Sequence, residues 1–202
     1  MFRTSRTLFK TAYYVSSLTV QNCLLVIILL SSYLEKFKLN SFKNLEFVII
    51  LIVFILMLIF CILATVYVFC VFKSVKNSSK TIGTSLVNID DVYNQGFREF
   101  LLSIVLPMIS TYPIIDSPIM SFTMVVILQI LVYFFFINSS DIFPNLTLAI
   151  CGYYIYTGSD NTGKKYFVFG RRKNIADILK SRVEAIPFSG GSENNIMIVK
   201  EK

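Results

Sequence analysis

The sequence contains no histidine and no tryptophan, and only 15% of its 202 residues are charged. Without histidine, the chain lacks imidazole bases, Ser-His and Cys-His nucleophile pairs, and histidine ligands for metals. Soluble domains usually carry about a quarter charged residues, so this low share argues against an ordinary cytosolic enzyme. The composition therefore predicts a protein with no enzymatic activity, no metal site and no cofactor.

Cysteine is also scarce, with four residues at Cys23, Cys61, Cys70 and Cys151 and no closely spaced pair. Three of the four lie inside apolar runs. We therefore expect reduced, buried cysteines that act as small apolar side chains, not disulfides or zinc ligands.

Apolar residues are abundant, at 55% of the chain, with a mean hydropathy of +0.68. The run 47–72 holds no ionisable acid or base, and it exceeds the roughly 20 residues that a helix needs to cross a bilayer. The stretch 100–137 is too long for one crossing, and Pro113 and Pro118 flank its one acid, Asp116. We therefore predict a four-helix transmembrane bundle within residues 1–137, with spans at about 11–34, 47–72, 97–115 and 119–137.

The last two predicted helices have an alternative arrangement as a re-entrant pair that enters and leaves the membrane on one side. Both arrangements return the tail to the same compartment. With a cytoplasmic N-terminus, sixteen lysines and arginines fall on the inner side and three on the outer side. We therefore expect a multi-pass protein with both termini in the cytoplasm, whose first helix is a signal anchor and not a cleaved signal.

Between the second and third spans, the polar segment 73–95 has no strong helical period and is interpreted as a surface loop. Residues 138–152 predict a short interfacial helix, with Ser140 or Asp141 as its cap and Gly152 as its stop. Beyond it, residues 153–202 predict a small cytosolic β-rich tail. Strands at 153–157 and 164–170 form a hairpin, and segments 183–188 and 195–199 add strands to give a sheet of three or four.

Of the polar residues within the predicted spans, Ser17, Gln21, Asn22 and Gln129 are the candidates for a role between helices or along a pore. Such groups usually form hydrogen bonds between neighbouring helices, although they also suit the lining of a pore. No acid or base lies deep in any predicted span, which disfavours an ion-coupled transporter.

In the tail, alternation places Tyr154 and Tyr156 on one face of the hairpin, with Tyr153 and Ile155 on the other. The hairpin ends in the basic cluster Arg171, Arg172 and Lys173. The cluster and the two tyrosines Tyr154 and Tyr156 are candidates for binding anionic lipid headgroups or a soluble partner. Direct binding of nucleic acid is disfavoured because the tail holds nine basic and six acidic residues.

The segment 143–156, the turn that follows it, and the segment 166–173 together resemble KwaA, the membrane subunit of the Kiwa bacterial anti-phage system. The resemblance extends to the expected plan of helices followed by a small sheet. It implies a homo-oligomer of the bacterial inner membrane, with a tetramer favoured, that senses phage attack. It also implies a cytosolic, nucleic-acid-binding effector, KwaB, as partner, and it assigns a function to no individual residue.

The leading hypothesis is thus a non-enzymatic membrane sensor and scaffold. In it, the helices respond to a disturbance of the bilayer and the tail passes that change to the effector. Two alternatives remain open at this point. One is an oligomeric pore or lysis protein lined by the polar face of the first helix, and the other is an immunity protein against a pore-forming bacteriocin.

Overall fold

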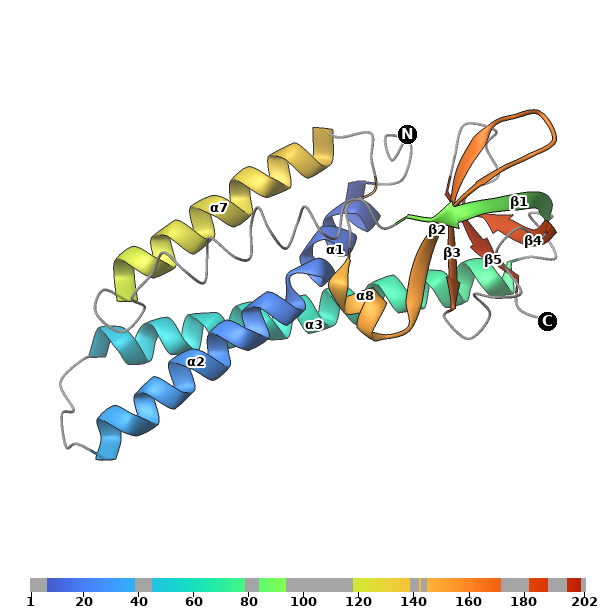
Figure 1. Ribbon diagram of the computed structural model, residues 1–202. Helices are drawn as coiled ribbons and strands as arrows, with labels where there is room; N and C mark the ends of the chain where they lie inside the picture. The colour runs from blue at the N-terminus through green and yellow to red at the C-terminus, as the bar shows by residue number, and fades with distance from the viewer. Residues whose placement is uncertain are drawn as a thin grey trace.

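The computed structural model describes residues 7–38, 45–78, 84–93, 118–138, 142, 145–171, 182–188 and 196–200. Figure 1 shows an elongated molecule with most of its helices at one end and its strands at the other. The described helices are α1 (Thr7–Ser17), α2 (Thr19–Lys38), α3 (Leu45–Asn77), α7 (Pro118–Asn138) and α8 (Leu146–Ile150). The described strands are β1 (Ser85–Val92), β2 (Tyr153–Ser159), β3 (Lys165–Arg171), β4 (Arg182–Pro187) and β5 (Ile196–Val199).

The helix α3 connects the two ends of the molecule. Its 33 residues extend about 50 Å at about 1.5 Å per residue, and Figure 1 shows it passing α1 and α2 and reaching the strands. It contains the predicted apolar helix at 47–72. Among the described helices, α3 alone is long and apolar enough to cross a bilayer, and α1 with α2 adds a second crossing if the bent pair counts as one span.

The four-helix transmembrane bundle that we predicted from hydropathy is wrong. The expected span 11–34 is divided into α1 and α2, which meet at a 40° bend. The apolar part of α7, Phe122–Asn138, is shorter than the roughly 20 residues that a crossing needs. The expected span 97–115 lies outside the described residues. Hydropathy averaged over a window does not register the hydroxyl side chains that break a helix inside an apolar run.

The strands form a closed barrel in the order β1-β2-β3-β5-β4, in which β1 pairs with both β2 and β4. All pairs are antiparallel except β3 with β5. The predicted hairpin is confirmed as β2 and β3, but the predicted small sheet of three or four strands is wrong, because the strands form a closed barrel of five. The strand that closes the barrel is β1, which lies in the segment 73–95 that we interpreted as a surface loop.

Alternating side chains divide the barrel into an inner and an outer core. The inner cluster comprises Val87, Ile89, Tyr156, Val168, Ala185, Met197 and Val199. On the outer side, Phe169, Ile186, Ile196 and Ile198 join a second cluster with residues of the helices. All four residues of β5 are buried because one face of this strand lines the barrel and the other packs against the helices.

Two glycines allow close approaches within the barrel. A Cβ atom on Gly158 would lie 2.6 Å from the carbonyl oxygen of Asn88 on β1, and the two strands are paired there. A Cβ atom on Gly170 would lie 3.0 Å from the ring of Tyr156. The absent side chains therefore let β1 meet β2 and let a large tyrosine occupy the interior.

The four cysteines are all free, in agreement with the expected reduced state. The expected burial holds only for Cys61, because Cys23, Cys70 and Cys151 are exposed. An apolar run does not imply burial inside the protein, since an apolar helix surface can also face outward.

Candidate functional site

The chain bends where α1 ends and α2 begins, beside Leu18. The Ser16 hydroxyl donates to the carbonyl oxygen of Tyr13 at 2.7 Å, and the Ser17 hydroxyl donates to that of Tyr14 at 2.6 Å. Thr19 then donates to the carbonyl oxygen of Ser16 at 2.8 Å. Hydroxyl groups that bond to preceding carbonyls compete with the helical ladder and bend helices. This cluster of hydroxyls accounts for the break.

The short helix α8 is attached directly to this break. Asn145 Nδ2 donates to the Tyr13 carbonyl oxygen at 3.0 Å and to Ser16 Oγ at 2.6 Å. The Thr147 hydroxyl donates to the Ser16 carbonyl oxygen at 2.7 Å. These three side chains are buried, and a buried polar group without a hydrogen-bond partner lowers the stability of the fold. We call Ser16, Asn145 and Thr147 the clamp.

Asn145 has a second role, because it is also the N-cap of α8. Its side-chain oxygen accepts a hydrogen bond from the backbone N–H of Leu148 at 3.1 Å. The cap that we predicted at Ser140 or Asp141 is therefore wrong, although the short helix itself is confirmed. One side chain thus starts α8 and holds the break of the first two helices.

Only two residues, Cys151 and Gly152, separate α8 from β2. Gly152 has a φ of 82°, a left-handed conformation that glycine adopts at helix ends without strain. The short connection keeps α8 next to the start of β2 in the barrel.

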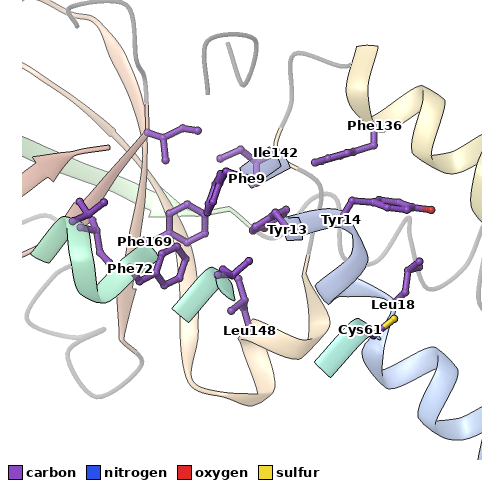
Figure 2. Packing of buried hydrophobic residues seen from close by; sticks show 14 of the residues in the cluster. Phe9, Tyr13, Tyr14, Leu18, Cys61, Phe72, Phe136, Ile142, Leu148 and Phe169 are labelled. Atoms are coloured by element: carbon purple, nitrogen blue, oxygen red, sulfur yellow. The ribbon is translucent and has the colours of Figure 1, made fainter. Parts of the chain in front are cut away.

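Aromatic packing joins the same elements a second time, as Figure 2 shows. Tyr13 is completely buried, and its ring meets that of Phe169 edge-on at a centroid distance of 6.1 Å and that of Phe136 at 6.3 Å. Phe72 of α3 lies 5.0 Å from Phe169 and 5.3 Å from Tyr153. The break, α3, α7 and the barrel therefore share one core, and such aromatic pairs add to its stability.

One turn beyond the break, two of the predicted polar residues meet. Gln129 Nε2 donates to Asn22 Oδ1 at 3.3 Å, and Asn22 Nδ2 donates to Cys61 Sγ at 3.2 Å. Asn22 is completely buried, and Gln129 is 8% exposed. The structure thus brings Asn22 and Gln129 together across α2 and α7. Ser17 bonds within its own helix, and Gln21 lies half-buried on α2.

A cavity of about 660 Å³ adjoins this amide pair, between the bent helices, α3 and α7. Its lining includes Tyr14 and Leu18 at the break and both amides. Most of the remaining lining is aliphatic. The volume falls within the range of about 300–1,000 Å³ that is typical of small-molecule sites.

The tail residues are placed differently from our expectation. Tyr156 is completely buried in the barrel, and burial raises the pKa of its phenol. Its inclusion among surface contacts is therefore wrong. The alternation is confirmed, since Tyr154 packs with Tyr156 on the inner cluster whereas Tyr153 and Ile155 pack on the outer one.

Of the three residues in the basic cluster, the structure describes Arg171. This residue is exposed, and its guanidinium lies 5.6 Å from the centroid of the Tyr153 ring. Lys76 Nζ, at the end of α3, lies 5.8 Å from the same centroid. Arg172 and Lys173 lie outside the described residues.

Sequence reasoning missed the clamp. Asn145 directly precedes the apolar residues of α8, and an asparagine at that position is a common start signal of a helix. That signal identifies the N-cap but gives no indication that the same amide reaches a carbonyl more than 130 residues away. In the part of the chain that the structure describes, no group of three or more Cys, Asp or Glu side chains is arranged to hold a metal ion.

Comparison with protein families gives a match over most of the chain. The family model described as anti-phage protein KwaA matches residues 9–191, which is most of the chain. No curated protein and no solved structure matches.

Proposed function

The chain belongs to the KwaA family of anti-phage proteins, and from this membership we propose that it is a membrane-associated sensor that reports phage attack to a partner. Anti-phage defence is the role of the family. The remaining steps are our proposal: the apolar helices respond to a disturbance of the bilayer, and the barrel presents that response to a cytosolic effector.

Membrane association is supported by the family and by the one long apolar helix. Ile52, Leu63 and Val66 of α3 are each more than half exposed, as suits side chains that contact lipid. Lys73 and Lys76 follow at the end of α3 that meets the barrel, and positive charge favours the cytoplasmic side of the bacterial inner membrane. We therefore place the barrel in the cytoplasm.

The N-terminal part of the chain belongs on that same side. Phe9 of α1 packs against Phe188, which follows β4, at a centroid distance of 5.5 Å. In this arrangement, α1 and α2 together form one bent crossing of the membrane, and α3 crosses back to the cytoplasm. Both termini therefore lie in the cytoplasm. Exposed apolar side chains on α2, α3 and α7 are available for contacts between copies in a homo-oligomer, for which the family resemblance favours a tetramer.

The observation that carries the proposal is the double role of Asn145. A change in the angle between α1 and α2 moves the Tyr13 carbonyl oxygen and Ser16 Oγ, both of which are bonded to Asn145. Because Asn145 also caps α8, and α8 leads into β2 after two residues, the change reaches the barrel. The clamp thus converts helix bending into a barrel displacement.

A partner would meet the barrel on the outer face of β1 and the start of β4, where Arg182 and Glu184 are exposed. The outer face of β2 and β3, which carries the ligand in oligonucleotide-binding barrels of five strands, contributes Tyr153 and Phe169 to contacts with Phe72 of α3. This favours a protein partner over direct binding of nucleic acid. Leu86 of β1 is 54% exposed and is the strongest candidate for an apolar contact with that partner.

The test is a plaque assay in cells that carry the complete defence system. We expect Asn145→Ala to reduce protection by at least tenfold in plating efficiency while the protein still accumulates in the membrane fraction. Asn138→Ala is the matched control, because Asn138 is exposed and, within the part of the chain that the structure describes, bonds to the Phe134 carbonyl oxygen of its own helix. Full protection by Asn145→Ala would overturn the proposed route through the clamp.

The two alternative functions have less support. A pore lined by the first helix requires polar groups that face water, whereas Asn22 is completely buried and bonds to Gln129 and Cys61. Immunity against a bacteriocin is a different role from the one that the family description gives.

A further inference from the structure

The cavity beside the break combines a long apolar wall with a short polar edge. Its aliphatic wall includes Val53, Leu56 and Met57 of α3 and Val126 of α7. The polar edge consists of Asn22, Gln129 and the hydroxyls of Thr11 and Tyr133, which lie 3.0 Å from each other. Such a surface is complementary to a molecule that is mostly hydrocarbon and has one polar group.

The amides at this edge are incompletely bonded. Asn22 Nδ2 reaches only the sulfur of Cys61, which is a weak acceptor. Gln129 donates to Asn22, but no described group donates to the Gln129 side-chain oxygen, although this residue is more than nine-tenths buried and lines the cavity. Buried polar groups are normally satisfied, so the edge offers an unused acceptor to a ligand.

Charge narrows the class of ligand. The described residues that line the cavity include no lysine, arginine, aspartate or glutamate. A charged headgroup inside the cavity would therefore be desolvated without a counter-charge, which is very unfavourable. The ligand must be uncharged, and it must supply a hydrogen-bond donor to Gln129.

We propose that this cavity is a binding site for an uncharged, single-chain amphiphile from the bilayer, whose hydrocarbon chain lies along α3 and whose hydroxyl group donates to Gln129. The ligand contacts Tyr14 and Leu18, which line the cavity at the helix break. Its presence or absence therefore biases the angle between α1 and α2. This last consequence rests on the proposed function, whereas binding itself does not.

The absence of tryptophan from the chain makes a direct test possible in detergent solution. Leu56→Trp places a single fluorophore at the cavity, and Ile62→Trp places one elsewhere on α3, at a position that is 47% exposed and does not line the cavity. A brominated long-chain fatty alcohol is then titrated as a contact quencher. We expect saturable quenching at one alcohol per protomer for Leu56→Trp, and only a shallow decline without saturation for Ile62→Trp.

Two further variants test the mode of binding. Val126→Phe, introduced together with Leu56→Trp, fills part of the cavity and is expected to raise the half-saturating concentration at least tenfold. The methyl ether of the same alcohol lacks a donor and is expected to bind about fivefold more weakly, as suits one neutral hydrogen bond. Gln129→Leu should remove this difference between the alcohol and the ether.

Equal quenching at the two tryptophan positions, or an unchanged half-saturating concentration in Val126→Phe, would overturn the site. If Gln129→Leu does not fold, the first two comparisons still decide the question. Saturable binding together with full phage protection by Asn145→Ala would leave the site in place and defeat only the proposed function.

Discussion

At the scale of single residues, the stability of the barrel depends on two glycines, which have no side chain, and on Asp160, whose carboxylate accepts several hydrogen bonds. Gly158 has no room for a Cβ atom beside the Asn88 carbonyl oxygen. By contrast, Gly163 is in open space and requires glycine only because its φ is 80°. The two glycines are therefore constrained by different physics, one by packing and one by backbone conformation.

We predict that Gly158→Ala destabilises the protein by about 1–3 kcal/mol or more, the usual cost of forcing an extra carbon into a packed site. Gly163→Ala should cost about 1 kcal/mol, because only the left-handed conformation is penalised. Thermal unfolding of the two variants in the same detergent measures the difference. A smaller loss for Gly158→Ala than for Gly163→Ala would contradict this account of the β1–β2 contact.

Asp160 stabilises the turn between β2 and β3 through its charged form. The Thr162 hydroxyl at 2.5 Å, the backbone N–H groups of Lys164 and Thr162, and the Tyr166 hydroxyl all donate to its carboxylate. These bonds, the one from the Thr162 hydroxyl first, lower the pKa of Asp160 to about 2. Its folded pKa lies below that of an unfolded aspartate, about 3.9, so its contribution is complete above pH 4 and is lost as the pH falls toward 2.

We predict that Asp160→Asn lowers the melting temperature at pH 5 and that its difference from the unmodified protein shrinks between pH 4 and pH 2. The measurement is thermal unfolding at a series of pH values. Asp90→Asn, at an exposed position of β1, controls for the change in net charge. A difference that stays constant down to pH 2 would show that the turn does not depend on the charged carboxylate.

At the scale of elements, the sequence indicated regular patterns well and local exceptions poorly. The run 47–72 predicts α3 because it is long and uncharged, and the alternation of Tyr153 to Tyr156 predicts both faces of β2. The break at Leu18 was missed because Ser17 was assigned to packing between helices, whereas its hydroxyl bonds within its own helix. Hydropathy does not distinguish these two uses of a hydroxyl.

We predict that the clamp stabilises the arrangement of α1 and α8. Thr147→Val keeps the shape of the side chain but leaves the buried Ser16 carbonyl oxygen without the hydroxyl that bonds to it at 2.7 Å. Because the Thr19 hydroxyl still donates to that carbonyl oxygen, we expect a loss of about 0.5–1.5 kcal/mol, the usual net value of one hydrogen bond. Chemical unfolding in detergent gives the value.

Thr123→Val is the matched control for this change. The Thr123 hydroxyl bonds to the Ile119 carbonyl oxygen of its own helix and is exposed, so its removal should cost within about 0.5 kcal/mol, as for ordinary surface substitutions. Equal losses for the two threonine variants would mean that the clamp carries no special stability.

At the scale of the whole molecule, long-range contacts decided what the sequence did not reveal. Val87 and Ile89 of β1 point into the barrel, but Asn88, Asp90 and Asp91 interrupt the apolar pattern, so the strand signal is weak. Its partners, β2 and β4, follow more than 60 residues later, and pairing at that distance leaves no local pattern. The same holds for the clamp, because the sequence shows its serine, asparagine and threonine but does not show that they form hydrogen bonds with each other in the fold. The closed barrel and its attachment to the helices therefore follow from tertiary structure alone.

The closed barrel leads to a last prediction, on where the partner docks. The helices cover the outer face of β2, β3 and β5 and the part of β4 that holds Ile186, which leaves the outer face of β1 and the start of β4, around Leu86 and Glu184, to a partner. Leu86 lies opposite Glu184 in the register of these two strands. Leu86→Asp places a charge where an apolar contact is expected, and interface centres exclude unpaired charge. We expect this variant to lose co-purification with the proposed cytosolic effector by at least tenfold while its melting temperature stays within a few degrees.

Lys165→Glu provides the matched control for the docking face. Lys165 is exposed at the start of β3, away from β1 and β4 in the strand order, so this substitution changes a surface charge on a different part of the barrel. The control should retain the effector. If the Leu86→Asp variant also retains the effector, the docking surface does not lie on β1 and β4. If both variants lose the effector, the attraction depends on the overall positive charge, because each substitution lowers the net charge.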